Sequence, residues 1–534
     1  MHLIDQRTKQ IMEDCKTKAR SAGLSFDKET LEYIVTNRDM IDLSPKVMIP
    51  TLYDYWVNDV DVLKNRGQYK LYPHNPYETV INSRPAISYY NDNNPDWMNI
   101  MIFYHVIGHI DFFQNNHLFE KTWNDDFVGQ ALSDKRLIES LRVAHGRYCD
   151  YVIEFGRSID NITGYFNQFK HEDYIKKSEP EEIISFYFDN FLPNIAGKKQ
   201  NDIFKEIYEY NLLIDKGRDI ARTIFINTVK NKHPEFESYF ERHKGLLNSG
   251  IEMDVLEFIT EYSPFLKKEK NQWMRSVLSI IRNTSLYFAP QIRSKIINEG
   301  WASYWHDTLF IQDERIKGHE ADYAKLNAGV TSLSRVGLNP YAIGLRLIQH
   351  IEDLADKGKI SWDFQKIKDS DQREKYDKKI MKGKEAIFEL RKNFSDFVLI
   401  NTFVDQDFVD KYDLFVVGKR LDTSRNVYQY YIKSRKAEDY KQMLIDSLYH
   451  PPHIVVDTEL TDDNTLYLVH KFEGKQLIKD FIPDVIHGLG YLWGGDVKIE
   501  TTEIVVSNTS SGQSRMNQRV RYVFHDGKVN KEKI

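Results

Sequence analysis

The sequence predicts a mainly α-helical N-terminal domain followed by a smaller α+β domain. Up to about residue 395, apolar residues recur at helical spacing in long segments. From residue 396 onward, short runs rich in β-branched and aromatic residues replace them. A chain of 534 residues is also too long for one small core. We therefore expect two domains, 1–395 and 396–534.

The N-terminal domain is expected to be helical because its long apolar repeats have a helical period. These repeats occupy residues 135–160, 203–230, 252–283 and 290–312. In the last of them, Pro290 suits the first turn of a helix. The highly charged stretch 352–393 is expected to be an exposed connection that contains a solvated helix.

The C-terminal domain is expected to combine strands with two helices. Its strand-like runs are FVLINTF, DLFVVGKR, VYQYYIK, HIVVDTEL, TLYLVHKF and VKIETTEIVV. The segments 437–449 and 475–490 interrupt these runs and have a helical pattern. An α+β domain of about 140 residues has an ordinary size.

Composition and charge exclude several classes of function. The chain has 73 basic and 79 acidic residues and no block dominated by Lys and Arg, so a nucleic-acid footprint is not indicated. Its two cysteines, Cys15 and Cys149, form neither a disulfide framework nor a Cys-rich zinc site. No apolar run reaches the length of a membrane span, and the first residues lack the apolar core of a signal peptide. We expect a cytoplasmic protein.

The pair His105 and His109 is the strongest chemical signal. It lies in MIFYHVIGHIDFFQNN, where a spacing of four residues puts both imidazoles on one face of a helix, as in sites where two histidines bind one metal ion. Nearly every position from 97 to 113 is apolar, so this helix is expected to be buried on most of its surface. An unsatisfied buried polar group costs roughly 1–3 kcal/mol. The imidazoles therefore share a metal ion or hydrogen-bond to neighbouring carboxylates or carbonyls.

The segment PQIRSKIINEGWASYWHDTLF supplies an acidic partner. Glu299 and His306 lie on the same stripe as its apolar anchors, and a buried carboxylate must be paired, protonated or bound to a cation. The alternative is a buried Glu–His or Glu–Tyr hydrogen bond. Gly300 weakens a helix but is tolerated where another backbone approaches closely.

His306 and two further side chains complete the candidate set. His306 is a candidate for acid–base chemistry and an alternative ligand. His145 also lies on an apolar helical stripe, and it is either a second acid–base candidate or a hydrogen-bonded core histidine. Asp111 follows the histidine pair and is expected to orient an imidazole.

Several long motifs occur in order along the chain. They are TNRDMIDLSPKVMIPTLYDYW, YPHNPYETVIN, ISYYNDNNPDW, HVIGHIDFFQNN, NEGWASYWHD, NPYAIGLRL, LYLVHKFEGKQL and GYLWGGDVKIET. Through these motifs the chain resembles the SpoVR family, the stage V sporulation protein R group, over nearly its whole length. The resemblance implies a link to sporulation and spore cortex formation, although the family also occurs in bacteria that make no spores. It further implies two partners, a PrkA-type serine kinase and a von Willebrand A-like protein.

The motif NEGWA at Asn298–Ala302 is similar to the helix that supplies the third zinc ligand in gluzincin metallopeptidases. There two histidines come from HExxH and the glutamate follows on a second helix. This similarity implies a zincin-like helical core in which His105, His109 and Glu299 bind a divalent metal, chiefly zinc, and leave a position for water. Iron and manganese also accept imidazole and carboxylate ligands.

Two departures from that pattern leave the function open. Val106 replaces the glutamate of HExxH, and the separation between His109 and Glu299 is far longer than in those peptidases. One interpretation is a metal-dependent hydrolase of amide-type bonds, with cell-wall precursors or the proteins that handle them as targets. The other is a non-enzymatic regulatory or scaffold protein, in complex with the kinase and the von Willebrand A-like protein. Val106 favours the second, because an activated water still needs a proton acceptor.

Overall fold

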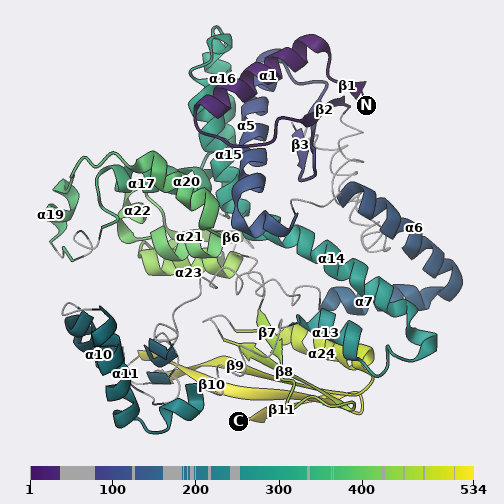
Figure 1. The fold of residues 1–534 in the computed structure, drawn as a ribbon. Helices are drawn as coiled ribbons and strands as arrows, with labels where there is room; N and C mark the ends of the chain where they lie inside the picture. The colour runs from purple at the N-terminus through teal and green to yellow at the C-terminus, as the bar shows by residue number, and fades with distance from the viewer. Residues whose placement is uncertain are drawn as a thin grey trace. The chain divides into compact units, whose positions relative to one another are not determined.

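The structure is a computed structural model that describes residues 2–36, 78–122, 127–159 and most of 253–534, with stretches between 183 and 240. The motif at 36–56 and the Pro-rich joint at 72–77 lie almost wholly outside the described residues. The fold is mainly α-helical with a smaller α+β C-terminal part, which confirms the predicted class (Figure 1). No helix in the described ranges is long and apolar enough to cross a membrane.

The chain forms two compact units, each built from two separate segments. Unit 1 comprises Met1–Asn161 and Lys268–Pro451, and unit 2 comprises Ile162–Lys267 and Pro452–Ile534. The domain boundary expected after residue 395 therefore differs from these divisions. The reason is that helix α21 (Asp396–Phe403), which follows that position, packs on α15 (Lys295–Phe310) of unit 1.

Unit 1 contains a small sheet that the sequence did not predict. Its order is β1 (His2–Leu3), β2 (Thr30–Val35), β4 (Ala86–Asn91) and β3 (Glu78–Ile81). Strands β2 and β4 are parallel, and β3 is antiparallel to β4. Helices α1 (Gln6–Ser21) and α5 (Asp96–Asn115) pack on each other, and α5 also contacts β3 and β4. The strands are short, which makes them hard to recognise among longer helical patterns.

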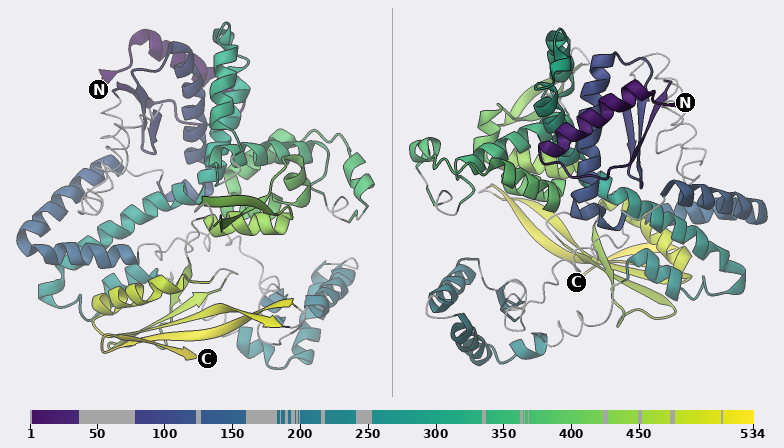
Figure 2. Two further views of the ribbon diagram at one scale, coloured as in Figure 1. Left: turned by 180° about the vertical axis from the view of Figure 1, so that it is seen from behind. Right: turned by 45° about the horizontal axis from the view of Figure 1, so that its top comes forward.

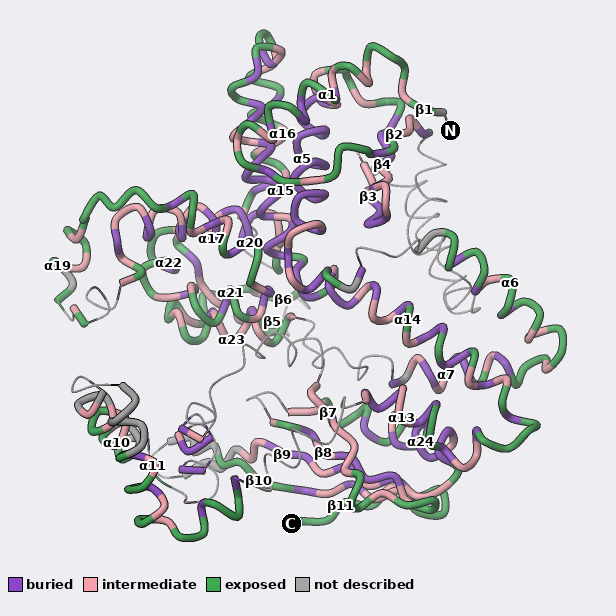
Figure 3. Tube along the Cα trace, viewed as in Figure 1, coloured by how far each residue is buried: buried purple, intermediate pink, exposed green. Residues whose placement is uncertain are grey.

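The centre of unit 1 is a stack of helices. Helix α5 lies beside α15, which packs on α17 (Pro340–Asp356), and α17 packs on α20 (Gly383–Asn393) (Figures 1 and 2). Both α5 and α15 are buried along most of their length (Figure 3). The surrounding helices are α6 (Phe127–His145), α7 (Arg147–Ser158), α14 (Trp273–Arg293), α16 (Glu320–Val330), α19 (Ser370–Lys375), α22 (Gln406–Lys411) and α23 (Ala437–Ser447).

Three local expectations in unit 1 were wrong. Pro290 lies in the last turn of α14 instead of opening a helix, and α15 begins at Lys295. The charged stretch 352–393 is not wholly exposed, because Ile387, Leu390 and Arg391 of α20 are buried against its neighbours. The run FVLINTF forms helix α21, which Ser395 caps, so β-propensity yielded there to helix packing.

The five remaining strand predictions are confirmed. Strands β5 (Val416–Asp422) and β6 (Val427–Ser434) form a two-stranded sheet in unit 1. Unit 2 has a five-stranded sheet, in the order β11 (Lys528–Lys533), β10 (Gly512–His525), β9 (Asp496–Thr509), β8 (Thr465–Lys471) and β7 (His453–Val456). Helix α24 (Ile482–Trp493) packs on this sheet, and α13 (Val255–Tyr262) contacts β7. Helices α10 (Gln200–Ile214) and α11 (Arg218–Lys232) also belong to unit 2.

Candidate metal centre

The two histidines of α5 face the same point in the core of unit 1. His105 and His109 are 6% and 8% exposed, and their Nε2 atoms lie 3.1 Å apart. One helical turn separates them, so the backbone of α5 places both imidazoles on the same face of the helix. The helix is nearly apolar on every side, which holds both imidazoles away from bulk water.

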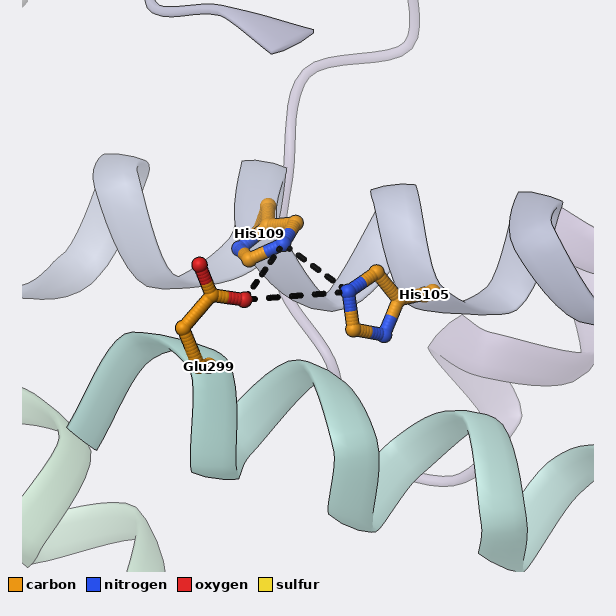
Figure 4. Close-up of side chains that lie close together, drawn as sticks. All are labelled: His105, His109 and Glu299. Atoms are coloured by element: carbon orange, nitrogen blue, oxygen red, sulfur yellow. Dashed lines mark hydrogen bonds and ion pairs between the residues drawn. The ribbon is translucent and has the colours of Figure 1, made fainter. Parts of the chain in front are cut away.

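Helix α15 brings Glu299 to the same point. The Asp396 carboxylate accepts hydrogen bonds from the backbone N–H groups of Ile296 and Ile297, at 2.8 and 2.9 Å. Because the first N–H groups of a helix have no partner within it, this contact fixes where α15 begins. Glu299 follows one turn later and faces α5 (Figure 4).

Small residues allow the helices to approach closely. A Cβ atom on Gly108 of α5 would lie 2.8 Å from the Cα atom of Ala302 on α15. A Cβ atom on Gly300 would lie 2.3 Å from the carbonyl carbon of Gly344 on α17. The expectation that another backbone approaches Gly300 is therefore confirmed. The approach of Gly108 to Ala302 brings α5 close to α15, and with it the imidazoles close to the carboxylate.

Three ligand atoms converge between α5 and α15. Glu299 Oε2 lies 3.9 Å from His105 Nε2 and 3.6 Å from His109 Nε2 (Figure 4). In a tetrahedral zinc site, bonds of about 2.0–2.1 Å separate neighbouring ligand atoms by about 3.3 Å. The observed separations of 3.1, 3.6 and 3.9 Å are close to that value, so one small divalent ion fits among the three atoms.

The outer nitrogen of each imidazole has its own partner. His109 Nδ1 lies 3.0 Å from the amide oxygen of Asn298 and donates to it. His105 Nδ1 lies 2.9 Å from Nδ1 of His306, whose Nε2 contacts Asn327 Oδ1 at 3.2 Å. When Nδ1 of both ligand histidines carries the proton, both Nε2 lone pairs point toward Glu299. Hydrogen bonds of this kind orient metal-binding histidines.

The Glu299 carboxylate is divided between two environments. The hydroxyl of Tyr341, at the start of α17, donates a hydrogen bond to it. Its Oε2 atom, which faces the imidazoles, is buried and has no hydrogen-bond partner among the described residues. A buried acceptor without a donor is destabilising by about 1–3 kcal/mol. A cation beside Oε2 removes that penalty, so the donor set suits a metal ion.

Burial shifts the titratable groups of this centre toward their neutral forms. It lowers the pKa of His105, with further contributions from His109 and His306, and it lowers the pKa of His109. It raises the pKa of Glu299 to about 7 and lowers that of His306 to about 4. Neutral imidazoles are the form that binds metals, and a bound cation favours the ionised carboxylate.

The structure brings together four of the six candidate side chains. His105, His109 and Glu299 form the convergent group, and His306 lies behind His105. It does not bring His145 to this group: that side chain, at the end of α6, stacks on Trp273 of α14 with ring centroids 4.1 Å apart.

Asp111 does not orient an imidazole, so that expectation was wrong. Its carboxylate accepts hydrogen bonds from the backbone N–H of Ser25, from Trp301 Nε1 and from an Arg391 guanidinium nitrogen, at 2.7, 2.8 and 3.0 Å. It therefore ties α5 to α15 and α20. The amide of Asn298 takes the place expected for Asp111, beside His109.

Sequence reasoning missed a second carboxylate near the group. Glu78, the first residue of β3, interacts electrostatically with His109 and Glu299, and burial raises its pKa to about 7. Its position within the motif YPHNPYETVIN was the only available signal. Tyr341, in the motif NPYAIGLRL, was missed for the same reason, since neither residue belongs to a metal-ligand spacing.

Comparison with known proteins identifies the family. The model of the family described as SpoVR like protein matches residues 4–450. The chain is similar to the uncharacterized protein YcgB of Escherichia coli (strain K12), with 23% identity over 500 residues, which cover 88% of this chain and 86% of YcgB. No solved structure matches. Because the family model covers most of its length, the chain belongs to the SpoVR family.

Proposed function

We propose that this protein binds one divalent metal ion, chiefly zinc, through His105 Nε2, His109 Nε2 and Glu299 Oε2. One observation carries the proposal: these three buried atoms converge, and Oε2 has no hydrogen-bond donor among the described residues. Two imidazoles and one carboxylate are an ordinary donor set for catalytic zinc, and iron and manganese accept the same ligands.

We further propose that the site hydrolyses an amide-type bond. A zinc ion held by three protein ligands supplies Lewis-acid polarisation and an acidified water. The chain's own residues then orient the site: Asn298 and His306 fix the two imidazoles, and Tyr341 fixes Glu299. Cell-wall precursors, or the proteins that handle them, are the proposed targets, in keeping with the link between the family and the spore cortex.

Cleavage of defined amides tests this activity. Zinc-loaded protein is incubated with peptidoglycan-derived muropeptides and with unrelated peptides, and new primary amines are counted. We expect cleavage of the muropeptides by the parent and none by Glu299→Gln. Glu352→Gln is the matched control, because Glu352 bonds Tyr304 on another face of α15. Equal cleavage by the parent and Glu299→Gln contradicts the proposal.

A second candidate function is a regulatory or scaffold role in complex with a PrkA-type serine kinase and a von Willebrand A-like protein. Two observations favour it. Position 106 of α5 is a fully buried valine. The helix therefore offers no acidic group at the place where HExxH has its glutamate. The tyrosines Tyr428, Tyr430 and Tyr431 of β6 are about half exposed, as at protein-binding surfaces. Co-purification of the kinase with the parent, lost when these tyrosines are changed to serine in the full chain, is the expected result.

A further inference from the structure

Glu78 reaches the candidate metal centre from a different element than the ligands. Strand β3 runs antiparallel to β4, with Glu78 opposite Tyr90, and β3 packs against α5. This arrangement brings the Glu78 carboxylate within electrostatic range of His109 and Glu299. The residue as a whole is only partly buried, so it is not sealed from water.

The Glu78 carboxylate lies outside the ligand group itself. The ligand atoms of His105, His109 and Glu299 all lie within 4.8 Å of one another, and Glu78 is not a member of that group. A zinc ligand must come within about 2.2 Å of the ion. A proton acceptor needs only to reach the water that reacts, at about 2.6–3.2 Å. The exclusion of Glu78 from the ligand group therefore favours the second role over the first.

Two other titratable groups beside the ligands already have partners. His306 contacts His105 and Asn327, and Tyr341 donates to Glu299. Among the described residues, the Glu78 carboxylate makes no hydrogen bond or ion pair. Glu78 is therefore the acidic group of the described part that remains available beside the ligands. Helix α5 itself has Val106 at the position of the HExxH glutamate.

We propose that Glu78 is the proton-accepting residue of this centre, supplied by β3 in place of the glutamate that α5 lacks. The inference rests on the proposed hydrolysis. During that reaction the attacking water gives one proton to the Glu78 carboxylate as its oxygen bonds to the carbonyl carbon. The departing nitrogen takes this proton as the C–N bond breaks. The products are a carboxylic acid and an amine, and the Glu78 carboxylate is regenerated.

The test uses two small metal-binding probes, of which only one must release a proton in order to bind. Acetohydroxamic acid binds a metal ion as its anion, so near neutral pH it must give up a proton, whereas thiocyanate has none to give. Cobalt-loaded protein reports the binding of both through its visible absorption. We expect Glu78→Gln to keep stoichiometric cobalt and its thiocyanate affinity, but to bind acetohydroxamate at least about tenfold more weakly than the parent. Glu78→Asp should recover part of that loss.

The possible outcomes separate this inference from the proposed metal site. Glu352→Gln, the carboxylate-to-amide control, should match the parent with both probes. Unchanged acetohydroxamate affinity in Glu78→Gln overturns the proton-accepting role while the metal site stands. Loss of cobalt from Glu78→Gln also overturns it and makes Glu78 a ligand. A parent that binds no cobalt overturns the metal site and this inference with it.

Discussion

His105 Nδ1 lies 2.9 Å from His306 Nδ1, although the two residues belong to different helices and are 201 positions apart. Through this contact α15 orients an imidazole of α5, while Asn298 of the same helix orients His109. Helix α15 therefore supplies one ligand and positions the other two. The arrangement of the whole centre depends on how α15 packs against α5.

Removing the amide beside His109 should weaken metal binding without removing a ligand. We expect Asn298→Ala to lower zinc affinity by about 10–100-fold, because His109 loses the hydrogen bond that fixes its ring and tautomer. Competition with a chromophoric chelator measures the change. Asn401→Ala is the control, since Asn401 is exposed and its side-chain amide donates to a backbone carbonyl of its own helix. Equal affinities for both variants would show that Asn298 has no orienting role.

Adding a methyl group at the contact between α15 and α17 should destabilise unit 1. In Gly300→Ala the new methyl group would overlap the backbone of Gly344, and overpacking of this kind costs typically 1–3 kcal/mol. Gly329→Ala in α16 is the matched control, because no atom lies within 4 Å of its added Cβ. That change should leave the free energy of unfolding unchanged or raise it by up to about 1 kcal/mol. Urea denaturation compares the two, and equal stability would contradict the close approach.

The buried carboxylate of Asp313 should make stability depend on acidity. It accepts hydrogen bonds from Arg315, Tyr104 and Lys18, and despite burial these partners hold its pKa well below the ordinary value. Asp313 is therefore protonated near pH 4 in the unfolded chain, whereas in the folded protein it stays ionised at that pH. The stabilisation is complete above that pH and is lost as the pH falls toward the folded-state pKa.

The variant Asp313→Asn isolates this effect. Near pH 7 it should lower the free energy of unfolding by about 1.5–3 kcal/mol, because charged hydrogen bonds are lost. Between about pH 4 and pH 3 its stability should fall less steeply than that of the parent, by up to about 1.4 kcal/mol per pH unit. Denaturation curves at several pH values measure both quantities. Parallel pH profiles would refute the role of Asp313.

Zinc should stabilise the folded protein through the candidate centre. A ligand that binds only the folded state adds about 2.7 kcal/mol when its free concentration is 100 times the dissociation constant. We expect zinc to raise the unfolding temperature of the parent and a chelator to reverse the rise. His109→Ala should show neither response, whereas His145→Ala, whose ring stacks on Trp273 in the parent, should respond like the parent. A response in His109→Ala would point to binding elsewhere.

The sequence predicted the parts of this centre that depend on helical spacing. His105 and His109 share a face because four residues separate them, and Glu299 faces inward because apolar residues flank it at steps of three and four. Gly300 indicated a close backbone contact, since glycine lowers the stability of a helix and is tolerated where another backbone needs the space. Local periodicity determines each of these features.

The remaining parts depend on contacts between distant segments. Glu78 approaches the histidines only because β3 pairs with β4 and packs on α5, and Asp396 caps α15 from 100 residues away. Asp111 looked like a partner for an imidazole because it is near in sequence, yet its helical position directs it to Trp301 and Arg391. Spacing along one segment carries no information about such partners.

The metal content of the protein tests the central claim most directly. Protein purified without a metal-binding tag is analysed for zinc, iron and manganese, beside His109→Ala and Glu299→Gln, with circular dichroism to confirm that both variants are folded. The convergence of His105, His109 and Glu299 predicts close to one metal ion per chain in the parent and little in either variant. A folded parent that holds no metal and takes up none of the three when they are added would contradict it.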